Sequence, residues 1–265
     1  MSFLDTILET KRVEIALLKA EGVMAPVHGE GAHRSLRSAL LQRSTLGVIA
    51  EIKRKSPSKG VIQSSVDPVE RAKTYAAAGA TAISVLTDKV HFQGSIEDLI
   101  AVRQVVDIPV LRKDFIIDEL QIDEAVAAGA DAILLIAAAL SPQRLRELSS
   151  YAQNLGLDVL LEVHDVDELD AALAAKPSVL GVNNRNLHTF EVDLATTERV
   201  IAALPHDTLA ISESGIFGTA DARRMALTGA RAVLVGELLM RHAKLADVAN
   251  EVAALQVELP LPESR

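Results

Sequence analysis

The chain repeats one pattern eight times: a short aliphatic run, a polar loop and an amphipathic stretch. Strands that alternate with helices in this way indicate βαβ units and a parallel sheet. Six or seven repeats would favour an open, doubly wound sheet, whereas eight predict a single (β/α)8 barrel of the TIM type. The predicted strands are 47–53, 81–87, 109–115, 132–136, 158–163, 179–183, 209–212 and 232–236.

Local signals mark the ends of the predicted elements. Gly79, Gly129 and Gly229 each precede an alanine and a strand, at the position where a helix commonly stops. The pairs Asp67-Pro68 and Ser141-Pro142 each combine a capping residue with a proline suited to the first helical turn. They predict that helices cover residues 69–78 and 143–154.

Composition narrows the possible partners and the compartment. A length of 265 residues suits one barrel, and 49% apolar residues with only 3% aromatics predict an aliphatic core. A net charge of −9 argues against nucleic acid and anionic membranes as partners. The longest apolar run, 132–140, is too short to span a bilayer, and charges throughout residues 1–20 do not fit a signal peptide. The absence of cysteine excludes disulfides and thiolate chemistry. We expect a cytoplasmic protein.

Three segments are predicted along the chain. They are an N-terminal helical extension (1–46), the barrel (47–256) and a frayed C-terminal tail (257–265). The extension carries an apolar helical stripe and a second short helix at about 36–42; the stripe comprises Phe3, Leu4, Ile7, Leu8, Ile15 and Leu18. Two interpretations are open: a packing extension over the N-terminal face of the barrel, or a lid or wall of the active site. The first is favoured, because no residue with obvious chemistry stands out.

Polar side chains interrupt several predicted strands near their C-terminal ends, where a buried unpaired charge would be costly. These residues are Glu51, Lys53, Lys113, Glu162, Asn183, Arg185 and Glu213. Glu51 and Lys53 are two residues apart and therefore point to the same side. In this fold the active site lies at the C-terminal ends of the strands. The cluster could be a structural layer of ion pairs, but convergence of so many charges favours catalysis.

Two loops predict that the substrate carries a phosphate. Ser214-Gly215 follows the seventh strand and Gly236-Glu237 follows the eighth, matching the loop pair that often binds phosphate in this fold. The loop 54–60 after the first strand is basic and rich in hydroxyls. It could be a solvated loop, or a clamp that closes over a phosphate or carboxylate.

The segment 51–60, EIKRKSPSKG, closely resembles the signature of indole-3-glycerol-phosphate synthases of tryptophan biosynthesis. The resemblance continues in the expected order over nearly the whole chain, through FQGS (92–95), LRKDF (111–115), LEVH (161–164), GVNNRNL (181–187) and SESGI (212–216). It implies conversion of 1-(2-carboxyphenylamino)-1-deoxyribulose 5-phosphate to indole-3-glycerol phosphate, CO2 and water. No cofactor or metal is implied.

The resemblance also implies roles for the polar residues. Lys113 would protonate the substrate carbonyl oxygen during ring closure, and Lys53 would bind the carboxylate or assist later steps. The division of acid–base work in dehydration among Glu162, Glu51 and Lys53 is open. Asn183 and Glu213 would orient substrate hydroxyls.

The same resemblance implies the binding surfaces. Phe92, Phe115, Leu134 and Leu234 would line an aromatic pocket, and Ser56, Ser214, Gly215 and Gly236 would hold the phosphate. Glu237 would contribute its backbone N–H. Arg185 would either anchor the substrate carboxylate or buttress the glutamates. We expect a monomer or weak homodimer.

Three alternatives stay open. Lys113 could be the nucleophile of a Schiff-base aldolase. A sugar-phosphate isomerase could share the fold, because fold alone does not determine function. A phosphate-ligand sensor or scaffold barrel would bind without turnover.

Overall fold

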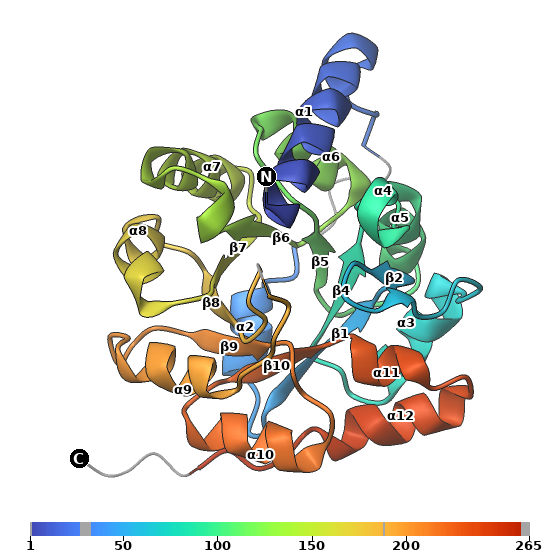
Figure 1. The fold of residues 1–265 in the computed structure, drawn as a ribbon. Helices are drawn as coiled ribbons and strands as arrows, with labels where there is room; N and C mark the ends of the chain where they lie inside the picture. The colour runs from blue at the N-terminus through green and yellow to red at the C-terminus, as the bar shows by residue number, and fades with distance from the viewer. Residues whose placement is uncertain (1, 27–32, 188, 261–265) are drawn as a thin grey trace.

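The computed structural model describes residues 2–26, 33–187 and 189–260. Its centre is a closed barrel of eight parallel strands in the order β1-β10-β9-β8-β7-β6-β5-β4 (Figure 1). The strands are β1 (Gly47–Ile52), β4 (Ala82–Leu86), β5 (Val110–Lys113), β6 (Ala132–Ile136), β7 (Asp158–Val163), β8 (Val179–Asn183), β9 (Ala210–Glu213) and β10 (Ala232–Val235). The predicted (β/α)8 barrel is confirmed.

The outer helices follow the strands and surround the barrel (Figure 1). They are α3 (Pro68–Ala77), α5 (Ile96–Arg103), α6 (Glu119–Ala128), α7 (Pro142–Asn154), α8 (Leu169–Ala174), α9 (Ala195–Ala202), α10 (Thr219–Leu227) and α12 (Leu245–Ala254). Short helices α4 (Lys89–Phe92) and α11 (Glu237–Arg241), and 3-10 turns η1 (Ala137–Ala139) and η2 (Val166–Glu168), complete the connections. No described helix is long and apolar enough to cross a membrane.

The predicted helix signals are confirmed. The Asp67 side chain accepts hydrogen bonds from the N–H groups of Val69 and Glu70, and Ser141 accepts one from Arg144. Both helices begin at the proline, one residue before the predicted start. The three glycines predicted as helix stops have φ angles of +87°, +84° and +98° at positions 79, 129 and 229. These left-handed conformations favour glycine, which has no Cβ.

Two apolar layers hold the barrel together. One lies between the strands and the outer helices, and includes Val48, Ile83 and Ala125. The other fills the barrel interior and includes Ile49, Leu111 and Leu160. This alternation follows from strand geometry, because successive side chains point to opposite faces.

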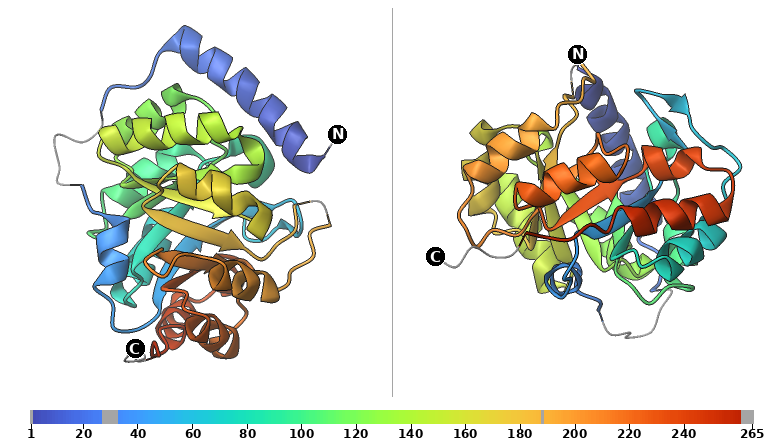
Figure 2. Two further views of the ribbon diagram at one scale, coloured as in Figure 1. Left: turned by 90° about the vertical axis from the view of Figure 1, so that its left-hand side faces the viewer. Right: turned by 90° about the horizontal axis from the view of Figure 1, so that it is seen from below.

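The N-terminal segment forms α1 (Phe3–Glu21) and α2 (Leu36–Leu41), which pack at different ends of the barrel. Leu36 and Leu40 of α2 join the interior cluster beneath Ala132 and Ala232, near the strand starts. The left view of Figure 2 shows α2 where the strands begin, and the N-terminal end of α1 towards their arrowheads. The prediction that the extension packs over the N-terminal face of the barrel therefore holds for α2 and not for α1.

The predicted C-terminal tail starts against the barrel. Val257 is buried, its carbonyl accepts a hydrogen bond from the Leu46 N–H at 2.8 Å, and Glu258 pairs with Thr45. Residues 261–265 of that predicted tail lie outside the described residues.

Candidate active site

The site arises from the side chains that point into the barrel. Along four strands the inward positions change from aliphatic to charged over one two-residue step, towards the C-terminal end. The pairs are Ile49 and Glu51, Leu111 and Lys113, Leu160 and Glu162, and Ile211 and Glu213. The aliphatic members close the barrel beneath the site, and the charged members form its floor.

Lys113 is at the centre of this floor. Its Nζ lies 3.4 Å from Glu213 Oε2, 3.7 Å from Glu162 Oε2 and 3.9 Å from Glu51 Oε2. Burial alone would lower the pKa of Lys113, but the charges of Glu213, Glu162 and Glu51 raise it above its ordinary value. The ammonium form is therefore maintained at neutral pH.

The three carboxylates differ in their other partners. Lys53 Nζ lies 2.5 Å from Glu51 Oε1, and His164 Nε2 lies 3.2 Å from Glu162 Oε1. Burial would raise the pKa of Glu162, yet Lys113 and His164 lower it to about 2. Among the described residues, Glu213 has an ion pair with Lys113 only, and burial together with the neighbouring Glu162 raises its pKa to about 8. One of three buried carboxyl groups is thus inclined to hold a proton.

The charged floor opens into a cavity lined by all sixteen predicted site residues. Beside the charges, the Phe92 and Phe115 rings lie with centroids 5.9 Å apart and planes tilted by 37°. Leu134 and Leu234 continue this apolar wall. The cavity therefore combines an apolar region, walled by Phe92, Phe115, Leu134 and Leu234 and named the aromatic slot, with a cluster of acids and bases.

Helix α1 forms another wall of the same cavity. Phe3, Leu4 and Ile7 line it together with Glu51 and the other floor residues. The favoured interpretation of the N-terminal stripe as a cover for the N-terminal face is therefore wrong for α1. An amphipathic pattern shows that one helical face is buried, but not against which end of the barrel.

Loops after β1, β9 and β10 also line the cavity. Ser214 and Gly215 have φ angles of +64° and +83°, and a Cβ at Gly215 would lie 2.5 Å from Val192. The basic loop after β1 contains a small hairpin of β2 (Lys55–Ser56) and β3 (Gly60–Val61). These elements contribute Ser56, Ser214 and Gly236 to the cavity lining.

Two predicted residues of the cavity lining, Arg185 and Glu237, pair with each other. Arg185 Nη2 lies 3.6 Å from Glu237 Oε2, and Lys59 Nζ lies 3.6 Å from Glu237 Oε1. Arg185 also donates a hydrogen bond to the Phe190 carbonyl at 3.1 Å. Among the described residues, no hydrogen bond or ion pair joins Arg185 to the glutamates of the floor, so no direct contact supports a buttressing role.

Comparison with known proteins identifies the family to which the chain belongs. The sequence model of the family "Indole-3-glycerol phosphate synthase" matches residues 4–255. A protein of that name from Oceanobacillus iheyensis is 48% identical over 264 residues, covering 97% of this chain and 99% of the relative. Proteins of the same name from Desulfotalea psychrophila and Exiguobacterium sibiricum are 48% and 50% identical to this chain. The matches cover 94% and 95% of this chain and 97% of each relative. The chain belongs to the indole-3-glycerol phosphate synthase family.

Solved structures add only the barrel architecture to this family assignment. Thiamine phosphate pyrophosphorylase from Pyrococcus furiosus superimposes with a TM-score of 0.60 at 19% identity, covering 83% of this chain and 96% of that one. A structure titled "Native KDPGal structure" gives 0.57 at 17% identity, covering 80% and 94%. At such identities the likeness concerns the fold alone.

Sequence reasoning missed several lining residues of this synthase-family cavity. Phe3, Leu4 and Ile7 come from α1, whereas Phe190 and Phe217 come from loops. Phe3 and Phe190 contact each other, with ring centroids 5.7 Å apart. A signal for α1 was present: Lys11 lies between Ile7 and Ile15 on the buried face, where a lysine requires a partner. The loop aromatics had no comparable periodicity.

Proposed function

We propose that the protein catalyses ring closure, decarboxylation and dehydration of 1-(2-carboxyphenylamino)-1-deoxyribulose 5-phosphate, giving indole-3-glycerol phosphate, CO2 and water. The observation that carries this proposal is the Lys113 ammonium, held by three carboxylates beside the Phe92–Phe115 slot. Family membership supports the same reaction, a step in tryptophan biosynthesis.

Ring closure needs a proton donor at the substrate carbonyl. As the aromatic carbon attacks C2 of the ribulose chain, negative charge develops on the C2 oxygen. Lys113 is the proton donor in this proposal, because its surroundings maintain the charged form next to the aromatic slot. The residues that would orient the chain are Asn183 and Glu213, which are paired in register on neighbouring strands.

The later steps need an acid and a base. Loss of CO2 restores the aromatic electrons without a cofactor. Dehydration then requires protonation of the departing hydroxyl and removal of a ring proton. Glu51, Lys53 and Glu162 supply these functions, and the 2.5 Å contact between Lys53 and Glu51 supports their action as a pair. Lys53 is also free to approach the substrate carboxylate from this position on the cavity wall.

The two halves of the substrate have separate sets of residues in the cavity. The carboxyphenyl ring would lie against Phe92, Phe115, Leu134 and Leu234. The phosphate would lie against Ser56, Ser214, Gly215 and Gly236, with the N–H of Glu237 beside them. Arg185 would anchor the substrate carboxylate, exchanging its contact with Glu237 for the ligand.

The electrostatics disfavour the Schiff-base alternative. A lysine nucleophile needs a free amine, whereas the pKa of Lys113 is raised by its three neighbouring carboxylates. No observation favours an isomerase or a sensor over the synthase. A cytoplasmic location and a monomeric or weakly dimeric state stay predictions.

The direct test is to mix the purified protein with the proposed substrate and follow indole fluorescence. We expect product formation in the presence of a metal chelator and without any added cofactor. A folded protein that forms no product at saturating substrate would contradict the proposal. Covalent trapping by borohydride with a ketose phosphate would instead support an aldolase.

A further inference from the structure

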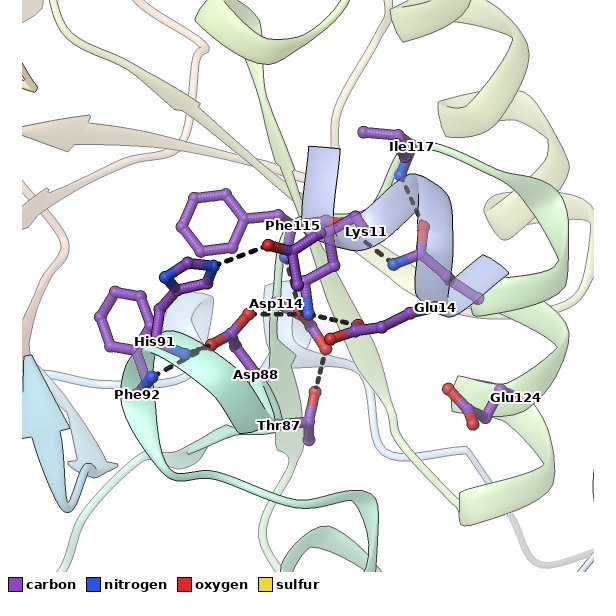
Figure 3. A network of polar contacts seen from close by, with 12 residues as sticks. Lys11, Glu14, Thr87, Asp88, His91, Phe92, Asp114, Phe115, Ile117 and Glu124 are labelled. Atoms are coloured by element: carbon purple, nitrogen blue, oxygen red, sulfur yellow. Dashed lines mark hydrogen bonds and ion pairs between the residues drawn. The ribbon is translucent and has the colours of Figure 1, made fainter. Parts of the chain in front are cut away.

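Lys11 of α1 is a buried cation outside the charged floor. Its side chain is 1% exposed, and Nζ lies 2.8 Å from each of Asp88 Oδ2, Asp114 Oδ1 and Glu14 Oε2 (Figure 3). Asp88 and Asp114 are themselves 0% and 3% exposed. A buried charge without a partner is costly, so Lys11 needs these carboxylates, and Asp88, whose one ion pair among the described residues is with Lys11, needs Lys11. Asp114 also lies 3.4 Å from Arg112 Nη2.

Asp88 connects the ammonium to the first ring of the aromatic slot. Its Oδ1 accepts hydrogen bonds from the N–H groups of His91 at 2.7 Å and Phe92 at 3.0 Å. It is the N-cap of α4, the single turn that carries Phe92. The contact with Lys11 uses the other oxygen, Oδ2, so one carboxylate contacts both α1 and α4.

Asp114 connects the same ammonium to the second ring. Its Oδ1 accepts a hydrogen bond from the Phe115 N–H at 2.8 Å, and its Oδ2 accepts one from Thr87 Oγ1 at 2.6 Å. Asp114 also directly follows Lys113 in the chain. Lys11 therefore joins two loop carboxylates that accept hydrogen bonds from the N–H groups of Phe92 and Phe115, whose side chains line the cavity.

The helix that supplies Lys11 also lines the cavity. Ile7 is one turn before Lys11 on the buried face of α1, and Phe3 contacts His91 of α4 with ring centroids 5.8 Å apart. Thr10 Oγ1 lies 3.1 Å from His91 Nε2. The contacts that dock α1 on the barrel therefore also hold the residues that position the Phe92 and Phe115 rings.

We propose that Lys11 is a positioning residue: by joining Asp88 to Asp114, it docks α1 on the barrel and sets the Phe92–Phe115 slot for the aromatic half of the substrate. This rests on the proposed function for the identity of the ligand. It predicts that loss of the Lys11 charge weakens binding of the aromatic half and spares the phosphate half, a separation that a general loss of stability would not produce.

The test compares Lys11→Met with Lys19→Met, a matched variant at an exposed lysine of the same helix that pairs with Asp118. We expect Lys11→Met to raise KM for the substrate at least tenfold, while the inhibition constant of inorganic phosphate changes less than twofold. Lys19→Met should change neither constant more than twofold, and Lys11→Arg should restore most of the substrate affinity. An unchanged KM, or equal rises in both constants, would overturn the proposal.

A milder variant covers the case in which Lys11→Met does not fold. Asp88→Asn retains an oxygen for the His91 and Phe92 N–H groups but removes the charge opposite Lys11. It should raise KM about threefold, and an unchanged KM would count against the proposal.

Hydrogen exchange separates this inference from the proposed reaction. The N–H groups of Phe92 and Phe115 should exchange at least tenfold faster in Lys11→Met than in Lys19→Met, with Asp88→Asn between them. This readout needs no turnover. Unchanged protection in a folded Lys11→Met protein would overturn the role of Lys11 even if the wild type forms indole product, and faster exchange would support it even if the wild type does not.

Discussion

Lys113 Nζ lies 3.4 Å from Glu213 Oε2, and the two residues are the last of β5 and β9. This contact joins the cation assigned to ring closure with the carboxyl group whose pKa is raised to about 8. Two further carboxylates, Glu51 and Glu162, lie within 3.9 Å of the same ammonium. The floor therefore places three carboxyl groups around one ammonium, and its charge should depend on pH.

Glu213 should destabilise the fold at alkaline pH. Its pKa is about 8 in the folded protein against an ordinary value of 4.5, so the folded chain holds a proton that the unfolded chain has released. The associated stabilisation is complete below pH 4.5 and is lost as the pH rises to about 8. Glu213→Gln stays neutral throughout, so above pH 8 it should be more stable than the wild type by about 1–2 kcal/mol.

Denaturant unfolding at pH 5 and pH 9 measures this difference. The gain of Glu213→Gln should be present at pH 9 and small at pH 5, and Glu21→Gln, at an exposed position, serves as the control. An identical difference at both pH values would refute a raised pKa for Glu213.

Gly181 should be essential for the position of Glu213. A Cβ at residue 181 would lie 2.1 Å from Glu213 Oε1 and 3.1 Å from Leu160 Cδ1. The Glu213 side chain can move away from the new methyl group, so Gly181→Ala should fold. The Glu213 carboxylate would then be displaced from its place beside Lys113. Misplacement by about 1 Å can cost about 100-fold in rate, and we expect a loss of kcat of that order. Gly218→Ala, where a Cβ meets no atom within 4 Å, should keep normal kcat; equal kcat in the two variants would show that Glu213 need not occupy this position.

His164 should lower the pKa of Glu162 through their 3.2 Å contact. Burial lowers the pKa of His164, but Glu162 and Glu168 raise it to about 10, so the imidazole is cationic at neutral pH. His164→Asn removes this charge and should raise the pKa of Glu162 by about half a unit or more. NMR titration of the Glu162 carboxyl group from pH 1 to 7 measures the shift, with His206→Asn as an exposed control. An unchanged pKa of Glu162 in His164→Asn would mean that His164 does not lower it.

Much of the floor could be predicted from strand alternation. Lys113 follows Leu111 at the next inward position of a buried strand, and only the C-terminal end of such a strand tolerates a charge. Family resemblance added Phe92, whose place depends on the capping of α4 by Asp88 and not on any periodicity.

The position of α1 on the barrel could not be predicted from its sequence pattern. The stripe of α1 gives the same periodicity whichever end of the barrel it covers. Lys11 decides the end, because its partners Asp88 and Asp114 lie after β4 and β5 at the C-terminal side. That pairing joins residues about 80 and 100 positions apart, and it becomes visible only when the barrel brings β4 and β5 together. Phe190 likewise reaches the cavity through a loop turn with φ of +60°.

The central claim is that Lys113 is the acid of ring closure. The most direct measurement is kcat for indole formation by Lys113→Ala at saturating substrate, alongside Lys73→Ala, an exposed lysine of α3. We expect Lys73→Ala to match the wild type and Lys113→Ala to lose nearly all turnover while remaining folded. If Lys113→Ala kept more than about a tenth of the wild-type kcat, a barrier change below about 1.4 kcal/mol, the assignment of Lys113 would be wrong.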